Sequence, residues 1–145
     1  MQAISEIMSR EVSVLNPSST LRQAAEQMKA QDVGSVPVCD GQKLVGMITD
    51  RDIAVRAVAE GRDPNATRVS DVMSGDVVWC FEDASTEEVA AKMADRQVRR
   101  VPVVNRDQKL VGIVALADLA TSQQGSDVKA DALEGISEDS GRPRS

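Results

Sequence analysis

The chain has 145 residues, enough for one compact domain with a sizeable apolar core. A net charge of -6, a single Phe, a single Trp and no Tyr disfavour nucleic-acid binding, which requires clustered cations and aromatic rings that stack on bases. The sequence shows neither an apolar run long enough to cross a bilayer nor a secretory signal. No membrane partner is therefore expected, and the cytoplasm is the default compartment.

The two cysteines give no indication of a metal site. Cys39 and Cys80 are distant in sequence, no CxxC pattern is present, and the chain contains no His, so zinc is not expected. Both cysteines are expected to be small buried apolar residues.

Residues 1 to about 122 contain the same unit twice. EIMSREVSVL at 6–15 matches DVMSGDVVWC at 71–80, VGSVPVCD at 33–40 matches VRRVPVVN at 98–105, and QKLVG recurs at 42 and 108. Self-similarity of this kind indicates two copies of one structural unit. We predict a first repeat at 1–60, a linker loop at 61–68, a second repeat at 69–122, and a polar tail at 123–145 that is expected to be disordered.

Each copy begins with an extended stretch, 12–15 or 77–80, followed by an amphipathic helix. Thr20 with Gln23, and Ser85 with Glu88, match the capping box, in which two side chains accept hydrogen bonds from free N–H groups at a helix start. The apolar residues of the two predicted helices follow at helical spacing: Leu21, Ala24, Ala25 and Met28, then Val89, Ala90 and Met93.

Two short β-branched runs follow each helix and predict two strands. Pro37 and Pro102 lie in the first run of each copy, where proline favours a strand start or a sheet edge because it lacks an N–H donor. Further helices are predicted at 52–59 and 118–122. The order is β-α-β-β-α twice, an α/β (α+β) fold in which the two units pack about a pseudo-twofold axis.

A duplicated unit with V-P-V before the hairpin and G-h-h-T-x-x-D after it resembles the CBS domain pair, or Bateman module, over residues 1–122. The phrases GMITDRDI, AEGRDPN and QVRRVPV are similar to small stand-alone bacterial members of the hypoxic response protein type. This resemblance implies a regulatory signal-transduction module without a required cofactor. It further implies that an adenosine-containing nucleotide such as AMP, ATP or NAD binds in clefts between the repeats, and that the protein forms a homodimer. Because the two repeats leave no catalytic domain, the module is expected to act on a protein target in trans, or through its own oligomer.

The resemblance also implies which residues bind the nucleotide. The Thr and Asp of T-x-x-D would contact the ribose and phosphate, and basic residues beside V-P-V would contact phosphates. The matching residues are Thr49, Arg51, Asp52, Val36, Pro37, Arg99, Arg100, Pro102 and Asp118. Gly46 would allow close backbone approach, and the two oxygens of Asp52 suit two vicinal ribose hydroxyls.

The two copies differ in these polar residues. Ala115-Leu116-Ala117 replaces Thr49-Asp50-Arg51, whereas Arg99-Arg100 replaces Gly34-Ser35. We hypothesise that the Thr49/Asp52 cleft binds an adenosine ligand. The Asp118 cleft would bind weakly, or would need phosphates that reach Arg99 and Arg100.

Two structural alternatives remain open at this stage. A capping box alone explains Thr49 and Asp52, and it is compatible with a ligand role. Arg99 and Arg100 could be a solvated strand start, or one that is ion-paired with Asp95 or Glu88. The alternative function is a ligand-independent dimeric scaffold that binds a protein partner. An enzyme is not expected, because no nucleophile–base arrangement is present.

Overall fold

The computed structural model describes residues 2–120, which fall into two compact units. The first unit is Ser13–Val77. The second unit combines the residues up to Val12 with those from Val78 onward. The tail predicted to be disordered at 123–145 lies outside the described residues. No helix within 2–120 is both long enough and apolar enough to span a membrane.

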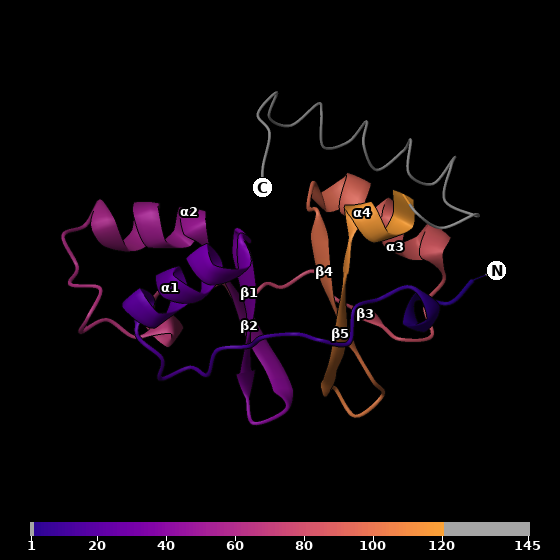
Figure 1. The fold of residues 1–145 in the computed structure, drawn as a ribbon, viewed down its shortest axis with the longest axis horizontal. Coiled ribbons are helices and arrows are strands. Elements are labelled where there is room, and N and C mark those ends of the chain that lie inside the picture. The colour runs from indigo at the N-terminus through magenta and orange to yellow at the C-terminus, as the bar shows by residue number, and fades with distance from the viewer. Residues whose placement is uncertain (1, 121–145) are drawn as a thin grey trace. The chain divides into compact units, whose positions relative to one another are not determined.

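The first unit is a β-hairpin with helices along one face (Figure 1). Its elements are α1 (Leu21–Gln31), β1 (Ser35–Asp40), β2 (Lys43–Thr49), α2 (Asp50–Ile53), the π-helical turn η2 (Ala54–Val58) and the 3-10 turn η3 (Val69–Asp71). Strands β1 and β2 are antiparallel. Leu15 forms a parallel bridge to Val38, and Ser74 forms an antiparallel bridge to Met47, so a short extended segment flanks each side of the hairpin.

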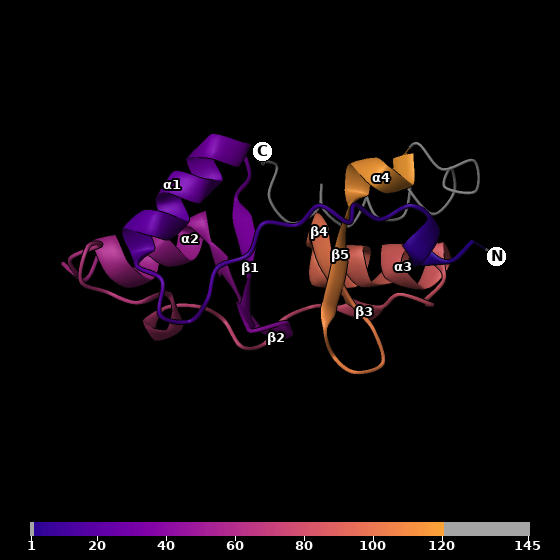
Figure 2. The ribbon, with the colours of Figure 1, turned by 60° about the horizontal axis from the view of Figure 1, so that its bottom comes forward.

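The second unit repeats this plan around its own hairpin, β4 and β5, with α3 and α4 beside it (Figure 2). Its elements are η1 (Ile4–Glu6), β3 (Cys80–Phe81), α3 (Thr86–Arg96), β4 (Arg100–Val104), β5 (Leu110–Ala115) and α4 (Leu116–Ala120). Strand β3 is parallel to β4, and β4 is antiparallel to β5. Ser9 bridges Ile113 at the outer side of β5. The predicted mixed α/β (α+β) class is therefore confirmed. The predicted β-α-β-β-α order is complete in the second repeat, whereas in the first repeat the segment before α1 forms only the isolated Leu15–Val38 bridge and no strand.

Each unit is completed by a segment that belongs to the other sequence repeat. Ser9 and Ile113 exchange two backbone hydrogen bonds of 2.8 and 2.9 Å, which places the chain start on the second hairpin. Met47 and Ser74 exchange two bonds of 3.0 Å, which place the start of the second repeat on the first hairpin. The compact units and the predicted repeats are thus different divisions of the chain.

Glycine allows each of these segments to cross its hairpin closely. A Cβ atom on Gly46 would lie 2.7 Å from Met73 Sδ and 3.0 Å from the Ser74 carbonyl oxygen. On Gly112 it would lie 2.5 Å from the sulfur of Met8. The two separations from sulfur are shorter than a carbon atom allows. A residue with a side chain at either position would therefore push away the segment that crosses the hairpin there.

Each unit has its own apolar core. The first contains Leu15, Leu21, Ala24, Met28, Val36, Val38, Ile48, Ala57, Val69 and Val72. The second contains Ile4, Met8, Cys80, Val89, Ala90, Met93, Val101, Val103, Val114, Leu116 and Leu119. The helix residues predicted from their spacing lie in these cores, except Ala25, which is exposed.

The predicted caps are correct for one helix and half correct for the other. Thr20 accepts from Gln23 N at 3.2 Å, and Gln23 Oε1 accepts from Thr20 N at 2.8 Å. Ser85 accepts from Glu88 N, but the Glu88 carboxylate faces the Ser85 hydroxyl at 3.4 Å instead of the backbone N–H. Ser85 forms a bridge to Ala3 just as Thr20 forms one to Arg68, so the bridge itself does not distinguish the two caps.

The remaining two helices begin two residues earlier than predicted, at Asp50 and Leu116, directly after the preceding strand. Each strand ends at a half-buried pair, Ser35 with Thr49 or Arg100 with Ala115, and the next residue begins the helix. Helix α2 passes into the π-helical turn η2 and ends at Val58.

Candidate functional site

In the first unit, hairpin register brings the start of β1 beside the start of α2. Ser35 pairs with Thr49, and Asp50 N donates to the Gly34 carbonyl at 2.9 Å. The residues before V-P-V and those of T-x-x-D, 14 or more positions apart in sequence, therefore form one polar corner. Ser35 was not singled out from the sequence, although the register of a short antiparallel hairpin would have placed it opposite Thr49.

Thr49 and Asp52 form a complete capping box at this corner. Asp52 N donates to Thr49 Oγ1, and Thr49 N donates to Asp52 Oδ2, both at 3.0 Å. Each side chain thus uses one acceptor atom for the cap. The hydroxyl proton of Thr49 and Oδ1 of Asp52 have no protein partner within residues 2–120. The structural alternative is therefore present, and it leaves one donor and one acceptor for a ligand.

The other predicted residues of the first unit differ in what they can offer. Val36 is 1% exposed and packs in the core, and Pro37 is also buried. Their side chains serve the hairpin, so a ligand contact would come from the main chain near them. Arg51 is exposed, and its guanidinium has no partner among the described residues.

The second unit has the same corner with different chemistry. Arg100 pairs with Ala115, and Leu116 N donates to the Arg99 carbonyl at 2.8 Å. Asp118 Oδ2 accepts from Ala115 N at 2.6 Å, so the carboxylate half of the cap survives without a hydroxyl. Pro102 is buried opposite Ile113. The two arginines predicted from the sequence therefore reach the Asp118 corner.

The predicted role of Gly46 is only partly right. A backbone does approach this glycine closely, but it is the segment at Met73 and Ser74. Because that segment occupies the space over Gly46, the residue supports the sheet that carries Thr49.

Both cysteines are buried, as predicted, at 3% and 2% exposure. Burial raises the pKa of the Cys39 thiol. Burial also raises the pKa of Cys80 to about 11, with Glu88 adding to the increase and Lys92 opposing it. These thiols are largely protonated near neutral pH and are poor nucleophiles. Within residues 2–120, no group of three or more metal-ligating side chains lies together.

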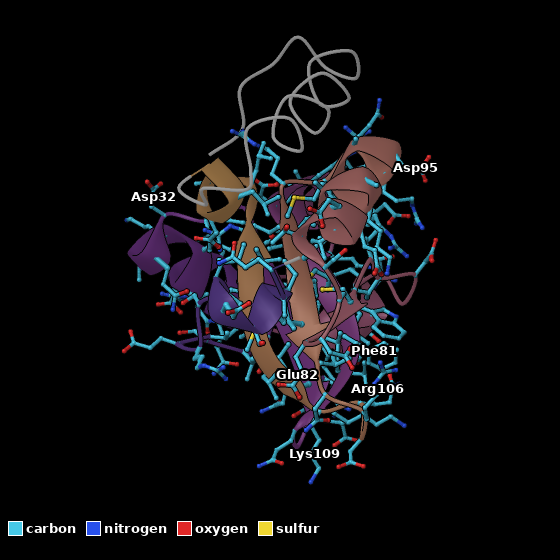
Figure 3. All side chains as sticks on the ribbon, turned by 90° about the vertical axis from the view of Figure 1, so that its right-hand side faces the viewer. Asp32, Phe81, Glu82, Asp95, Arg106 and Lys109 are labelled. Atoms are coloured by element: carbon cyan, nitrogen blue, oxygen red, sulfur yellow. The ribbon has the colours of Figure 1, made fainter. Side chains whose placement is uncertain are left out.

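The only two aromatic residues of the sequence lie on β3 and just before it, in the second unit. Trp79 and Phe81 pack edge to face with centroids 4.9 Å apart. The Arg106 guanidinium lies 4.0 Å from the Phe81 ring and donates to the Asp83 carboxylate at 2.8 Å, and Figure 3 shows Arg106 beside Phe81. This cluster ties β3 to the β4–β5 turn of the second unit.

The duplicated corner is consistent with a known family of paired domains. The family model of the CBS domain matches residues 4–58 and again residues 69–125. The chain belongs to the CBS domain family. The resemblance inferred from V-P-V and T-x-x-D is confirmed, and CBS pairs are regulatory modules, some of which bind adenosine ligands.

Several relatives match this CBS pair over nearly their whole length. The CBS domain-containing protein YhcV of Bacillus subtilis is 42% identical over 137 residues, covering 94% of this chain and 96% of its own. Hypoxic response protein 1 of Mycobacterium tuberculosis is 38% identical over 121 residues, covering 83% of this chain and 84% of its own.

Solved structures agree with these relatives. A crystal structure of Hypoxic Response Protein I with two coordinated zinc ions has a TM-score of 0.76 and 38% identity, covering 82% of this chain and 97% of that one. The CBS domain pair of protein MJ0100, in complex with 5-methylthioadenosine and S-adenosyl-L-methionine, has a TM-score of 0.71 and 29% identity, covering 83% and 94%.

Proposed function

We propose that this CBS pair is a non-catalytic regulatory module that senses an adenosine-containing nucleotide, with Thr49 and Asp52 as the principal ligand-binding residues. The observation that carries the proposal is that the Thr49 and Asp52 side chains at the first corner cap α2 and still keep hydrogen-bonding groups for a ligand. One acceptor on each side chain caps α2, and a hydroxyl donor and a carboxylate oxygen remain. A ribose diol can donate to that oxygen, which makes a charge-assisted hydrogen bond. The adenosine ligands of the MJ0100 CBS pair support the same chemistry.

The two corners favour different parts of a nucleotide. The first corner has hydrogen-bonding groups for a ribose, with Arg51 exposed beside them for a phosphate. The second keeps Asp118 but has Ala115 where a hydroxyl would be, and it adds Arg99 and Arg100. Arginine binds phosphate with two parallel hydrogen bonds. AMP should therefore prefer the first corner, and binding at the second should require a di- or triphosphate.

Titration calorimetry with AMP, ATP, NAD and S-adenosylmethionine tests this assignment. Asp52→Ala should weaken AMP binding at least about tenfold, because a charged hydrogen bond contributes about 1.5–3 kcal/mol. Asp118→Ala should leave AMP binding nearly unchanged. Gln23→Ala is the matched control: it removes one half of the capping box of α1, which lies outside the Thr49/Asp52 corner.

A thermal melt provides the independent check. A ligand at about 100 times its Kd should stabilise the protein by about 2.7 kcal/mol. Equal losses of AMP affinity in the two aspartate variants would refute the assignment of the corners. If no adenosine ligand raised Tm, the nucleotide function would be refuted and a ligand-independent scaffold favoured.

The exposed apolar surface of η2 favours contact with a second copy of the chain. Val55 and Val58 of the π-helical turn η2 are 51% and 63% exposed. Burying both in a symmetric contact would remove apolar surface from water. We therefore propose a homodimer, which then presents the module to a protein target in trans. In light scattering, wild type should be a dimer and Val58→Glu should be a monomer. A monomeric wild type at micromolar concentration would contradict the proposed homodimer.

A further inference from the structure

The half-buried methionines of this chain gather in one place. Among residues 2–120, Met47 and Met73 are half-buried. The other methionines of this range, Met8, Met28 and Met93, are 9% exposed or less. Because the oxidation of a sulfur atom follows its exposure, Met47 and Met73 are the two of these five that a dissolved oxidant reaches most readily.

Both residues lie where the chain segment at 73–74 crosses the first hairpin. Met47 on β2 exchanges two backbone hydrogen bonds of 3.0 Å with Ser74. Met73 packs over Gly46, where a Cβ atom would lie 2.7 Å from its Sδ and 3.2 Å from its Cε. The crossing therefore has no room for an added atom between the Met73 sulfur and the strand.

The matching crossing in the second unit is protected from solvent. Met8 takes the place of Met73 and lies over Gly112, but it is 9% exposed and belongs to the core. Ile113 takes the place of Met47 and carries no sulfur. The second crossing therefore has the same backbone pairing without a half-buried thioether, and it serves as an internal reference.

The two thiols compete poorly for an oxidant. Cys39 and Cys80 are 3% and 2% exposed, and burial raises the pKa of both thiols. The thiolate is the reactive form of cysteine, and little of it is present near neutral pH. In the folded chain, a dissolved oxidant therefore meets the two half-buried thioethers before it meets a reactive thiol.

We propose that Met47 and Met73 form a redox-sensitive crossing, at which hydrogen peroxide releases the 73–74 segment from the first hairpin. A sulfur lone pair attacks one peroxide oxygen, the O–O bond breaks, an S–O bond forms, and the other oxygen leaves as water after proton transfer. The sulfur loses two electrons and the peroxide gains them. Methionine sulfoxide is polar and bulkier, so it no longer packs against Gly46. A sulfoxide reductase restores the thioether and releases water while a dithiol becomes a disulfide.

Release of the segment should also weaken the first corner. Strand β2 continues from Met47 to Thr49, whose hydroxyl oxygen caps α2. Without the hydrogen bonds to Ser74, the end of β2 is supported in the sheet by its pairing with β1 at Ser35. We therefore expect oxidation to lower affinity for AMP, and this second part rests on the proposed nucleotide function.

Mild peroxide treatment of the full chain tests which sulfur atoms react. Peptide mapping by mass spectrometry should show sulfoxide at Met47 and Met73 at least about tenfold faster than at Met8, Met28 and Met93. In the urea-unfolded chain all five should react at similar rates, which provides the reference.

Amide hydrogen exchange and melting then measure the release. After oxidation, the N–H groups of Met47 and Ser74 should lose protection, whereas those of Ser9 and Ile113 should keep it. Tm should fall by at least about 4 °C. AMP should bind about threefold more weakly. Methionine sulfoxide reductases with dithiothreitol should restore all three measurements.

A double variant removes the sulfur atoms from the crossing. Met47→Leu/Met73→Leu should keep its Tm and its exchange pattern in peroxide, because leucine fills a similar volume and is not oxidised. Met28→Leu removes a buried sulfur from the core of the same unit and should respond to peroxide as wild type does. The reductase treatment needs no substitution, so it decides the same point if the double variant folds poorly.

Each outcome decides one part of the proposal. Equal oxidation rates at the five methionines of the folded chain, or unchanged exchange at Met47 and Ser74 after oxidation, would overturn the redox-sensitive crossing. A fall in Tm that Met47→Leu/Met73→Leu shares with wild type would overturn it as well. Release without any change in AMP affinity would overturn the link to the first corner. Release in a protein that binds no adenosine ligand would refute the proposed function and leave the redox-sensitive crossing standing.

Discussion

Alanine at Gly46 or Gly112 should detach the segment that completes each sheet. At Gly46 the new Cβ would lie 2.7 Å from Met73 Sδ and 3.0 Å from the Ser74 carbonyl oxygen, so Met73 must move and the pair of 3.0 Å bonds between Ser74 and Met47 is strained. Weakening two backbone bonds worth about 1 kcal/mol each, together with losing part of the Met73 packing, predicts a destabilisation of up to about 2–3 kcal/mol.

The same change at Gly112 should cost more. There the Cβ would lie 2.5 Å from Met8 Sδ and 2.8 Å from the Ser9 carbonyl oxygen. Met8 is only 9% exposed and belongs to the core, so its displacement also opens packed apolar surface. We expect about 3–4 kcal/mol. Each single variant should lower Tm, by roughly 6 °C at the lower end of these estimates and roughly 15 °C at the upper end.

Urea unfolding with two probes measures both effects. Trp79 is the only tryptophan and lies in the second unit, so its fluorescence follows that unit while circular dichroism follows both. Gly75→Ala is the control, because a Cβ there meets nothing within 4 Å and the expected change is within about 0.5 kcal/mol. If Gly46→Ala matched Gly75→Ala, the close crossing of the hairpin would be refuted.

Further substitutions test three local features: the cap, the turn at Gln108 and the two buried thiols. Thr49→Ala should destabilise the protein by about 1 kcal/mol, and Ala115→Thr should stabilise it by a similar or smaller amount, in urea titrations, because the hydroxyl half of a capping box is removed or added. Gln108→Gly should raise stability by about 0.5–1 kcal/mol in the same assay, since Gln108 is held at φ 67°. Unfolding free energy should fall from about pH 9 to about pH 11, because Cys80, whose folded pKa is about 11, and Cys39 ionise first in the unfolded chain. Replacing both with Ala should flatten that slope.

Controls for these changes come from the matched repeat. Gly41 lies in the turn of the first hairpin and also has a positive φ, 64°, so Gly41→Gln should destabilise the chain where Gln108→Gly stabilises it. If Thr49→Ala and Ala115→Thr changed the free energy of unfolding in the same direction, the cap argument would be contradicted. If the free energy of unfolding fell with pH just as steeply without the two thiols, groups other than the cysteines would cause the loss of stability at alkaline pH.

Features with local physical causes could be predicted from the sequence. Leu21 and Met28 are buried at their helical spacing, and the Thr20 box forms as its spacing requires. Thr49 and Asp52 meet because they lie one helical turn apart. Arg100 reaches Ala115 because a short antiparallel hairpin permits few registers, so most residues of the candidate corners followed from spacing alone.

The sequence by itself therefore determined the duplication, the helices, the two hairpins and the unequal chemistry of TDRD and ALAD. Only the tertiary structure decided which segment completes each sheet. IMS at 7–9 and VMS at 72–74 are nearly identical, and both hairpins offer a glycine for them to cross, so neither propensity nor pattern distinguishes the pairings. The structure pairs Ser9 with Ile113 and Ser74 with Met47, partners separated by about a hundred and about thirty residues. Such contacts depend on how the whole chain closes, and local spacing does not encode them.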